Sequence, residues 1–140
     1  MAEQGRRRAK AKVPLPRTRK TEAPRARRTR RTSSTRPLEI LAIDFETADY
    51  GRDSACAFGL AHIVGGEIIE TADYLIRPPR SEFAFSWLHG ITWNDVAGEP
   101  DFKALWPDLK THFAEVDFIA AHSASFDRGV LRACCSAHGF

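Results

Sequence analysis

The 140-residue sequence has few cysteines, a single methionine and no long hydrophobic run. The scarcity of cysteine and of apolar runs argues against a disulfide-stabilised or membrane-spanning protein. Its three cysteines, Cys56, Cys134 and Cys135, show no Cys-x-x-Cys spacing, so we expect neither a disulfide framework nor a zinc site. No apolar run approaches the roughly 18 residues of a membrane span, and no signal-peptide hydrophobic segment is present. We therefore expect a soluble, cytoplasmic protein with reduced thiols and no membrane partner.

Positive charge is concentrated at the N-terminus. Residues 1–36 contain 14 Lys and Arg and two acids, a net charge of +12, whereas residues 37–140 contain 7 and 16, a net charge of −9. The first segment has too few large apolar residues to offset its ordering entropy. We predict that residues 1–36 are a disordered basic tail that adds salt-dependent affinity for nucleic acid. A solvated extension without function and a wrongly chosen start codon are equally weighted alternatives.

Residues 38–47 read LEILAIDFET and form an apolar run that ends in two acids. Apolar residues on both faces are typical of a strand within a covered sheet. Because strand side chains alternate, Asp44 and Glu46 share one face and Phe45 points to the other. Two such carboxylates repel each other and raise each other's pKa unless a cation lies between them. The pair therefore indicates a metal ion.

Two further strands, CAFGLAHIV and EIIETADYLI, are predicted on either side of Gly65-Gly66, which can supply the positive φ values of a tight hairpin. The sheet then ends before Pro78, because proline cannot donate to a ladder. Thr92 and Asp95 predict the capping box of a short helix.

Residues 101–113, DFKALWPDLKTHF, place their apolar side chains on one helical face, and Pro107 predicts either a kink or the start of a new helix. Residues 118–122 are predicted to form a short buried strand. A last helix ends at Gly139 and carries the apolar stripe Phe126, Val130, Leu131 and Cys134. The order of elements predicts a mixed α/β sheet with flanking helices, in which the first strand is central.

Asp127 falls in the first turn of the last helix, just beyond the C-terminal end of a strand. Ligands of open α/β sheets bind at such ends, so Asp127 can join Asp44 and Glu46 around one cleft. Three carboxylates suit Mg²⁺ or Mn²⁺, which prefer oxygen ligands. Taken alone, Asp127 reads as a first-turn acid favoured by the helix dipole.

Three short segments and their order along the chain carry a family resemblance. They are Asp44-Phe45-Glu46-Thr47 after a strand, His89-Gly90-Ile91-Thr92 before a helix, and AAHSASFD, residues 120–127, between a strand and a helix. Together they resemble the DnaQ-like, or DEDD, family of 3′–5′ exonucleases, which includes the proofreading (epsilon) subunit of bacterial DNA polymerase III. The second segment favours the His-type (DEDDh) branch. The resemblance covers residues 38–140 and implies a ribonuclease H-like fold and hydrolysis of phosphodiester bonds at 3′ ends.

The resemblance also implies two bound Mg²⁺ or Mn²⁺ ions. By this carry-over Asp44 bridges both ions, Glu46 helps to hold the ion that activates water, and Asp127 holds the ion near the leaving oxygen. Such an arrangement suits an in-line displacement, because paired ions stabilise the attacking and departing oxygens together.

By the same resemblance, three residues line the pocket for the terminal nucleotide: Thr47, His89 and Phe126. Each has an ordinary alternative, which is strand pairing for Thr47, a turn for His89 and core packing for Phe126. The implied partners are a single-stranded 3′ end, DNA before RNA, and a DNA polymerase subunit.

The sequence departs from the family pattern after Asp127. The family's third motif, His-x₄-Asp, supplies a general base and a fourth carboxylate, and it does not occur between Asp127 and Phe140. The His-x₄-Asp spacings that end at Asp117 and at Asp127 itself are in the wrong places to replace it. We therefore expect the exonuclease domain, residues 37–140, to be truncated at its C-terminus, with an apolar edge strand, poor solubility and weakened catalysis.

Ser123 stands where many relatives have Asn, although serine can still cap a helix. Two other hypotheses stay open beside the exonuclease. The first is a noncatalytic nucleic-acid-binding module that relies on the basic tail, and the second is a fragment that functions only when a partner chain completes its sheet.

Overall fold

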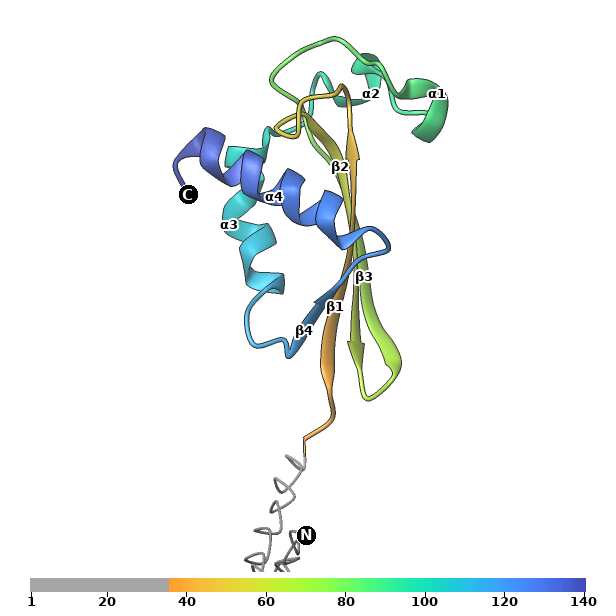
Figure 1. Ribbon diagram of the computed structural model, residues 1–140, viewed down its shortest axis with the longest axis vertical. Helices are drawn as coiled ribbons and strands as arrows, with labels where there is room; N and C mark the ends of the chain where they lie inside the picture. Colours follow the sequence, from red (N-terminus) through yellow and green to blue (C-terminus); the bar gives the residue numbers. More distant parts are fainter. Residues whose placement is uncertain (1–35) are drawn as a thin grey trace, which may run out of the picture. The chain divides into compact units, whose positions relative to one another are not determined.

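The computed structural model describes residues 36–140, so the predicted basic tail lies outside the described residues except for Arg36. Strands β1 (Glu39–Thr47), β2 (Ala55–Val64), β3 (Glu67–Leu75) and β4 (Phe118–Ala120) form one sheet in the order β3-β2-β1-β4 (Figure 1). β1 pairs with β2 in antiparallel fashion and with β4 in parallel fashion. The predicted mixed sheet with an interior first strand is confirmed.

The turn between β2 and β3 is the predicted glycine hairpin. Gly65 and Gly66 have φ values of 62° and 96°, a region that favours glycine. β3 ends at Leu75, and beyond it the backbone N–H of Arg77 bonds to the carbonyl of Pro100 instead of continuing the ladder. The sheet therefore stops before the two prolines, as predicted.

Four helices follow the hairpin within the described residues: α1 (Ser86–His89), α2 (Trp93–Val96), α3 (Phe102–His112) and α4 (Ala124–His138). The backbone N–H and the hydroxyl of Thr92 both donate to the Asp95 carboxylate at the start of α2, as the capping pattern predicted. α3 runs through Pro107 as one helix, so no new helix starts there. No helix among residues 36–140 is long and apolar enough to cross a membrane.

α3 and α4 lie on the same side of the sheet (Figure 1) and enclose the core with it. Alternate β1 residues face this core, and they pack with side chains of β2, α3 and α4: Leu41, Ile43, Phe45, Phe58, Leu60, Phe102, Leu109, Val130 and Cys134. The expectation that β1 is covered on both faces is wrong. Its other residues, including Asp44 and Glu46, are exposed or half-buried, because no helix of the described part covers that face.

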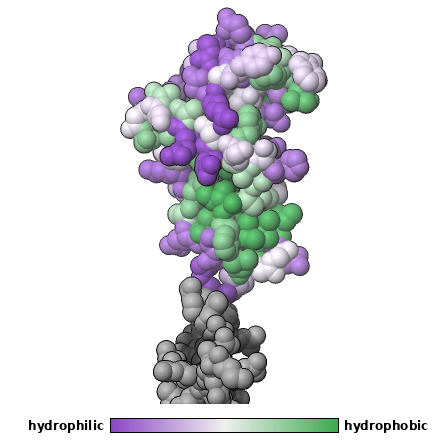
Figure 2. Space-filling model, in the orientation of Figure 1, coloured by the Kyte–Doolittle hydropathy of each residue, from purple (hydrophilic) through white to green (hydrophobic). Residues whose placement is uncertain are grey.

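The predicted burial of residues 118–122 is also wrong. β4 is shorter, ending at Ala120, and Phe118 and Ile119 are 61% and 52% exposed. The reason is its position at the sheet edge, where β1 pairs with one side and nothing in residues 36–140 pairs with the other. Figure 2 shows apolar surface gathered in the lower part of the domain, where β4 lies in Figure 1.

Candidate active site

One buried hydrogen bond joins the start of α4 to the end of β1. Asp127 is 2% exposed, and its Oδ1 accepts a bond of 3.0 Å from the backbone N–H of Phe45. Phe45 lies between Asp44 and Glu46, so this bond holds the third carboxylate beside the strand that carries the first two. The residues concerned are 82 positions apart in the sequence, and the fold brings them together.

Burial and the negative charge of Asp127 both raise the pKa of Asp44 and of Glu46. Burial raises the pKa of Asp44, the negative charge of Asp127 raises it further, and His122 opposes the shift. The pKa of Glu46 is likewise raised by burial, lowered by His89, and raised by the other two carboxylates. A cation at this position would relieve the repulsion.

The donor set fits a hard divalent ion, because it consists of carboxylate oxygens without thiol or clustered imidazole. Among the described residues, no three His, Cys, Asp or Glu side chains are already gathered into a complete ligand group. One oxygen of Asp127 is engaged by the N–H of Phe45. The remaining oxygen of Asp127 and the carboxylates of Asp44 and Glu46 are therefore the candidate ligands.

The open face of the sheet continues the acidic surface beyond β1. Gly59 of β2 lies opposite Asp44, and Asp73 of β3 lies opposite Gly59. These residues line a cavity of about 210 Å³ with Glu46 and Tyr74. A Cβ on Gly59 would stand 3.2 Å from Oδ1 of Asp73, so glycine leaves room for that carboxylate. Sequence reasoning missed Asp73, because the irregular pairing at His62 and Ile63 shifts the register and brings Asp73 rather than Ala72 opposite Gly59.

Thr47 and Phe126 line a second cavity of about 210 Å³ at the C-terminal end of β1. Its wall also contains Tyr50, Arg52 and Phe85, which sequence reasoning missed. The rings of Tyr50 and Phe85 meet edge to face with centroids 4.8 Å apart, and Tyr50 is 86% exposed. An exposed aromatic three residues after Thr47 was the available signal.

His89 does not line this cavity. Its Nε2 donates to the carbonyl of Thr47 at 3.2 Å, and its Nδ1 accepts from the N–H of Ile91 at 3.1 Å. Both ring nitrogens are thus engaged by backbone groups, which is the bonding of the Nε2–H tautomer. His89 therefore ties the turn after α1 to the end of β1, close enough to influence Glu46.

Arg80 holds the turn between β1 and β2. Its guanidinium bonds to Asp49 and Asp53 with shortest distances of 2.7 Å to each, and it lowers the pKa of both carboxylates.

Ser123 occupies the N-cap position of α4, but its side chain makes no cap hydrogen bond. Its φ and ψ of −122° and 64° differ from the extended conformation usual for a cap.

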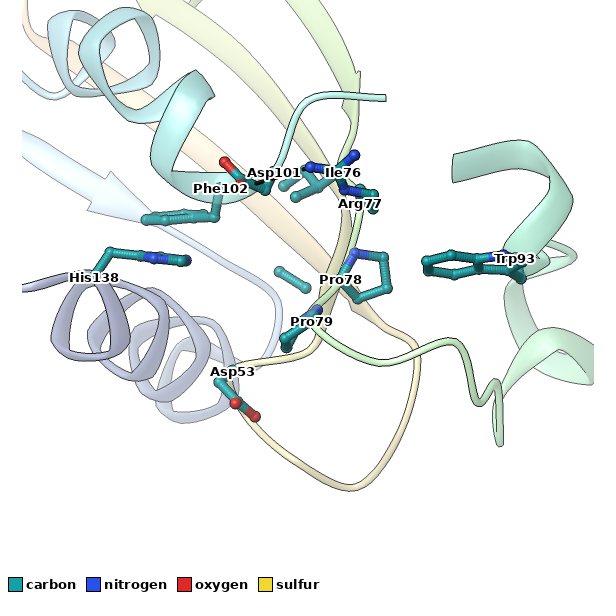
Figure 3. Close-up of a pocket in the computed structure, with 10 residues that line it drawn as sticks. Asp53, Ile76, Arg77, Pro78, Pro79, Trp93, Asp101, Phe102 and His138 are labelled. Carbon is teal, nitrogen blue, oxygen red and sulfur yellow. Dashed lines mark ion pairs between the residues drawn. The ribbon is translucent and has the colours of Figure 1, made fainter. Parts of the chain in front are cut away.

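A larger cavity of about 320 Å³ is lined by none of the three candidate metal ligands, Asp44, Glu46 and Asp127 (Figure 3). None of the predicted site residues lines it. Arg77 and Asp101 form an ion pair of 3.8 Å at its rim, and the ring of His138 stacks against Phe102. Its charged groups are therefore already partnered.

Residues 41–140 match the model of the RNase T family, which is described as exonuclease. The chain belongs to this exonuclease family. Membership agrees with the DnaQ-like resemblance of the sequence. No curated protein matches this chain.

The solved structures that are similar to this chain include three nucleases. Exonuclease X in complex with 5′ overhanging duplex DNA is 28% identical over 65% of this chain and 52% of that one, with a TM-score of 0.54. Cell-death related nuclease 4 is 12% identical over 73% and 40%, with a TM-score of 0.61. A full-length 3′-exonuclease is 18% identical over 74% and 40%, with a TM-score of 0.59. The predicted ribonuclease H-like fold is confirmed, and the chain spans about half or less of each structure.

Proposed function

We propose that residues 37–140 are a metal-dependent 3′–5′ exonuclease domain of the DEDD type, similar to the proofreading subunit of DNA polymerase III. The proposed substrate is the single-stranded 3′ end of a nucleic acid, DNA before RNA. The observation that carries the proposal is the bond between Asp127 and the N–H of Phe45, which holds Asp127 beside the strand end that carries Asp44 and Glu46. Exonuclease X, solved with duplex DNA, supports a nucleic-acid substrate.

In this proposal Asp44, Glu46 and Asp127 hold two divalent ions, Mg²⁺ or Mn²⁺. When bound, such ions stabilise the attacking and leaving oxygens of a phosphodiester. These three carboxylates are the proposed metal ligands within the 140 residues.

The terminal nucleotide is proposed to occupy the cavity that contains Thr47 and Phe126. Tyr50 and Phe126 offer aromatic rings on which a base can stack, a contact worth about 1–3 kcal/mol. His89 serves this pocket indirectly, because its ring fixes the carbonyl of Thr47. A DNA polymerase subunit is the proposed protein partner, in the cytoplasm.

Cleavage of a single-stranded DNA labelled at its 5′ end tests the function. With Mg²⁺ or Mn²⁺ the wild-type chain should produce a ladder that shortens from the 3′ end, and a 3′-phosphorothioate block should stop it. Asp44→Ala should abolish the ladder. Glu67→Gln, which removes an exposed acid at the far end of β3, should leave it unchanged. A ladder that survives Asp44→Ala would overturn the assignment.

A further inference from the structure

Arg52 places a positive charge at the edge of the candidate nucleotide pocket. It lies in the turn between β1 and β2, is exposed, and lines the cavity that contains Thr47 and Phe126. Its Nη1 donates to the carbonyl of Ser125 in the first turn of α4 at 3.3 Å. The guanidinium therefore lies near the start of the helix that carries Asp127.

The side chain of Arg52 packs against Gly129 of α4. A Cβ at Gly129 would overlap Nη1 of Arg52 and stand 2.8 Å from its Cζ and 3.2 Å from its Cδ. Glycine costs about 1 kcal/mol relative to alanine inside a helix. Its presence in the middle of α4 has a local reason here, since any side chain would displace Arg52.

The acids that flank Arg52 in the sequence do not neutralise it. Asp49 and Asp53 are both bound by Arg80, through hydrogen bonds of 2.7 Å from its Nε and Nη2. In the described part of the chain, Arg52 forms no ion pair of its own. Its donors that do not face Ser125 are therefore available to a ligand.

We propose that Arg52 binds a phosphate of the substrate strand beside the terminal nucleotide, an assignment that rests on the proposed nuclease function. A guanidinium offers paired donors that match phosphate oxygens. Residues 37–140 carry a net charge of −9, and the three site carboxylates repel a polyanion. Arg52 lies next to the stacking rings of Tyr50 and Phe126, and its positive charge there offsets the repulsion of the nucleic-acid strand.

The test is the binding of the 140-residue chain to a 5′-fluorescent decathymidylate in Ca²⁺, followed by anisotropy over a range of salt concentrations. Arg52→Gln should weaken binding about tenfold, as expected for the loss of a charged hydrogen bond. It should also reduce the slope of log K against log salt by about 0.7, the share of one phosphate on a single strand.

Gly129→Ala should weaken binding by a comparable factor, although it keeps the guanidinium and the net charge. It favours the helix, so a thermal melt should show α4 intact. The binding affinities of two matched control variants should stay within about twofold of that of the wild-type chain. Arg132→Gln removes an exposed arginine of α4, and Gly98→Ala adds a methyl group where no atom lies within 4 Å.

The outcomes separate this assignment from the proposed function. If the wild-type chain binds and cleaves DNA and Arg52→Gln only lowers the melting temperature, Arg52 is a brace between the turn and α4, and the assignment is wrong. Equal losses in Arg52→Gln and Arg132→Gln would also refute it, because they would reflect net charge alone. If the wild-type chain neither binds nor cleaves, the proposed function fails and the role of Arg52 fails with it.

Discussion

Asp127 has two separate contributions, one to the fold and one to the proposed chemistry. Its carboxylate is a candidate metal ligand, and its Oδ1 satisfies the buried N–H of Phe45. Asparagine keeps an oxygen acceptor but not the charge, whereas alanine removes both. The two variants can therefore separate the contributions.

Asp127→Asn should lower cleavage about a hundredfold or more, because metal assistance is worth several kcal/mol. Its free energy of unfolding should change little. Asp127→Ala should lose activity to the same extent and also lose about 1–3 kcal/mol of stability, the cost of an unsatisfied buried N–H. Urea denaturation and a cleavage assay measure the two effects. Equal stability of both variants would contradict the structural role of the bond.

Arg80 makes part of the stability depend on pH. Its hydrogen bonds are the main cause that lowers the pKa of Asp49 and Asp53 in the folded chain. A carboxylate with a lowered folded pKa stabilises the fold above its unfolded pKa, about 3.9, and that contribution is lost as the pH falls through the folded pKa. Arg80→Gln should thus cost about 1 kcal/mol near pH 6, since exposed pairs are screened by solvent.

The difference in free energy of unfolding between Arg80→Gln and wild type should disappear at low pH, because the carboxylates of Asp49 and Asp53 then become protonated. Urea midpoints measured from neutral to acidic pH check this. A constant difference across the whole range would show that Arg80 acts by packing alone.

The positions of individual residues in the fold were predictable where the information was local. The shared face of Asp44 and Glu46 follows from strand alternation, and Asp127 follows from its place after a strand. The packing contact between Arg52 and Gly129 was not predictable, because the contact joins a turn to a helix residue 77 positions later. Such contacts depend on tertiary packing and leave no periodic signal.

The two edge strands differ in how well they are protected against self-association. β3 carries Glu67, Glu70 and Asp73 along its length, whereas β4 consists of Phe118, Ile119 and Ala120 alone. Charges on an edge strand discourage pairing with another chain, and an exposed apolar edge promotes it. β4 is therefore the expected site of aggregation.

Phe118→Lys should raise the monomer fraction and the solubility of the chain, because it places a charge on this apolar edge. Sedimentation velocity at several concentrations measures the effect. Ile68→Lys is the matched control, since Ile68 is 65% exposed on the already charged edge strand β3 and its replacement should change little. A wild-type chain that stays monomeric and melts sharply would contradict the prediction.

At the level of elements, the boundaries of β1 to β3 were predictable to within one residue, and the end of α4 before its cap Gly139 was predictable too, from alternation, turn glycines and caps. Two expectations failed for the same physical reason. The apolar run through β1 and the short run at Phe118 both read as buried, yet only one face of the sheet is covered in residues 36–140. Apolar composition indicates a strand, but the cover over it depends on the rest of the fold.

Charge divides the whole molecule into a basic segment and an acidic domain. The basic segment holds 14 of the 21 Lys and Arg residues. The last of these, Arg36, belongs with the described residues, because it pairs with Asp117 at 2.6 Å and with Glu39 at 3.0 Å. A deletion that tests the tail should therefore end at residue 35.

Deletion of residues 1–35 should weaken binding to single-stranded DNA and flatten its salt dependence, by about 0.7 in slope for each phosphate that the tail neutralises. Anisotropy titrations of the chain with and without residues 1–35 measure both quantities. An unchanged slope would refute the contribution of the tail. Binding that depends wholly on the tail, in a chain that does not cleave, would favour the noncatalytic alternative.

The central claim is that Asp44, Glu46 and Asp127 form one divalent-metal site. Titration with Mn²⁺, followed by the electron paramagnetic resonance of the free ion, tests it most directly. The wild-type chain should bind up to two ions and Asp44→Asn should lose that binding, while Glu67→Gln should bind as wild type does. Equal Mn²⁺ binding by wild type and Asp44→Asn would contradict it.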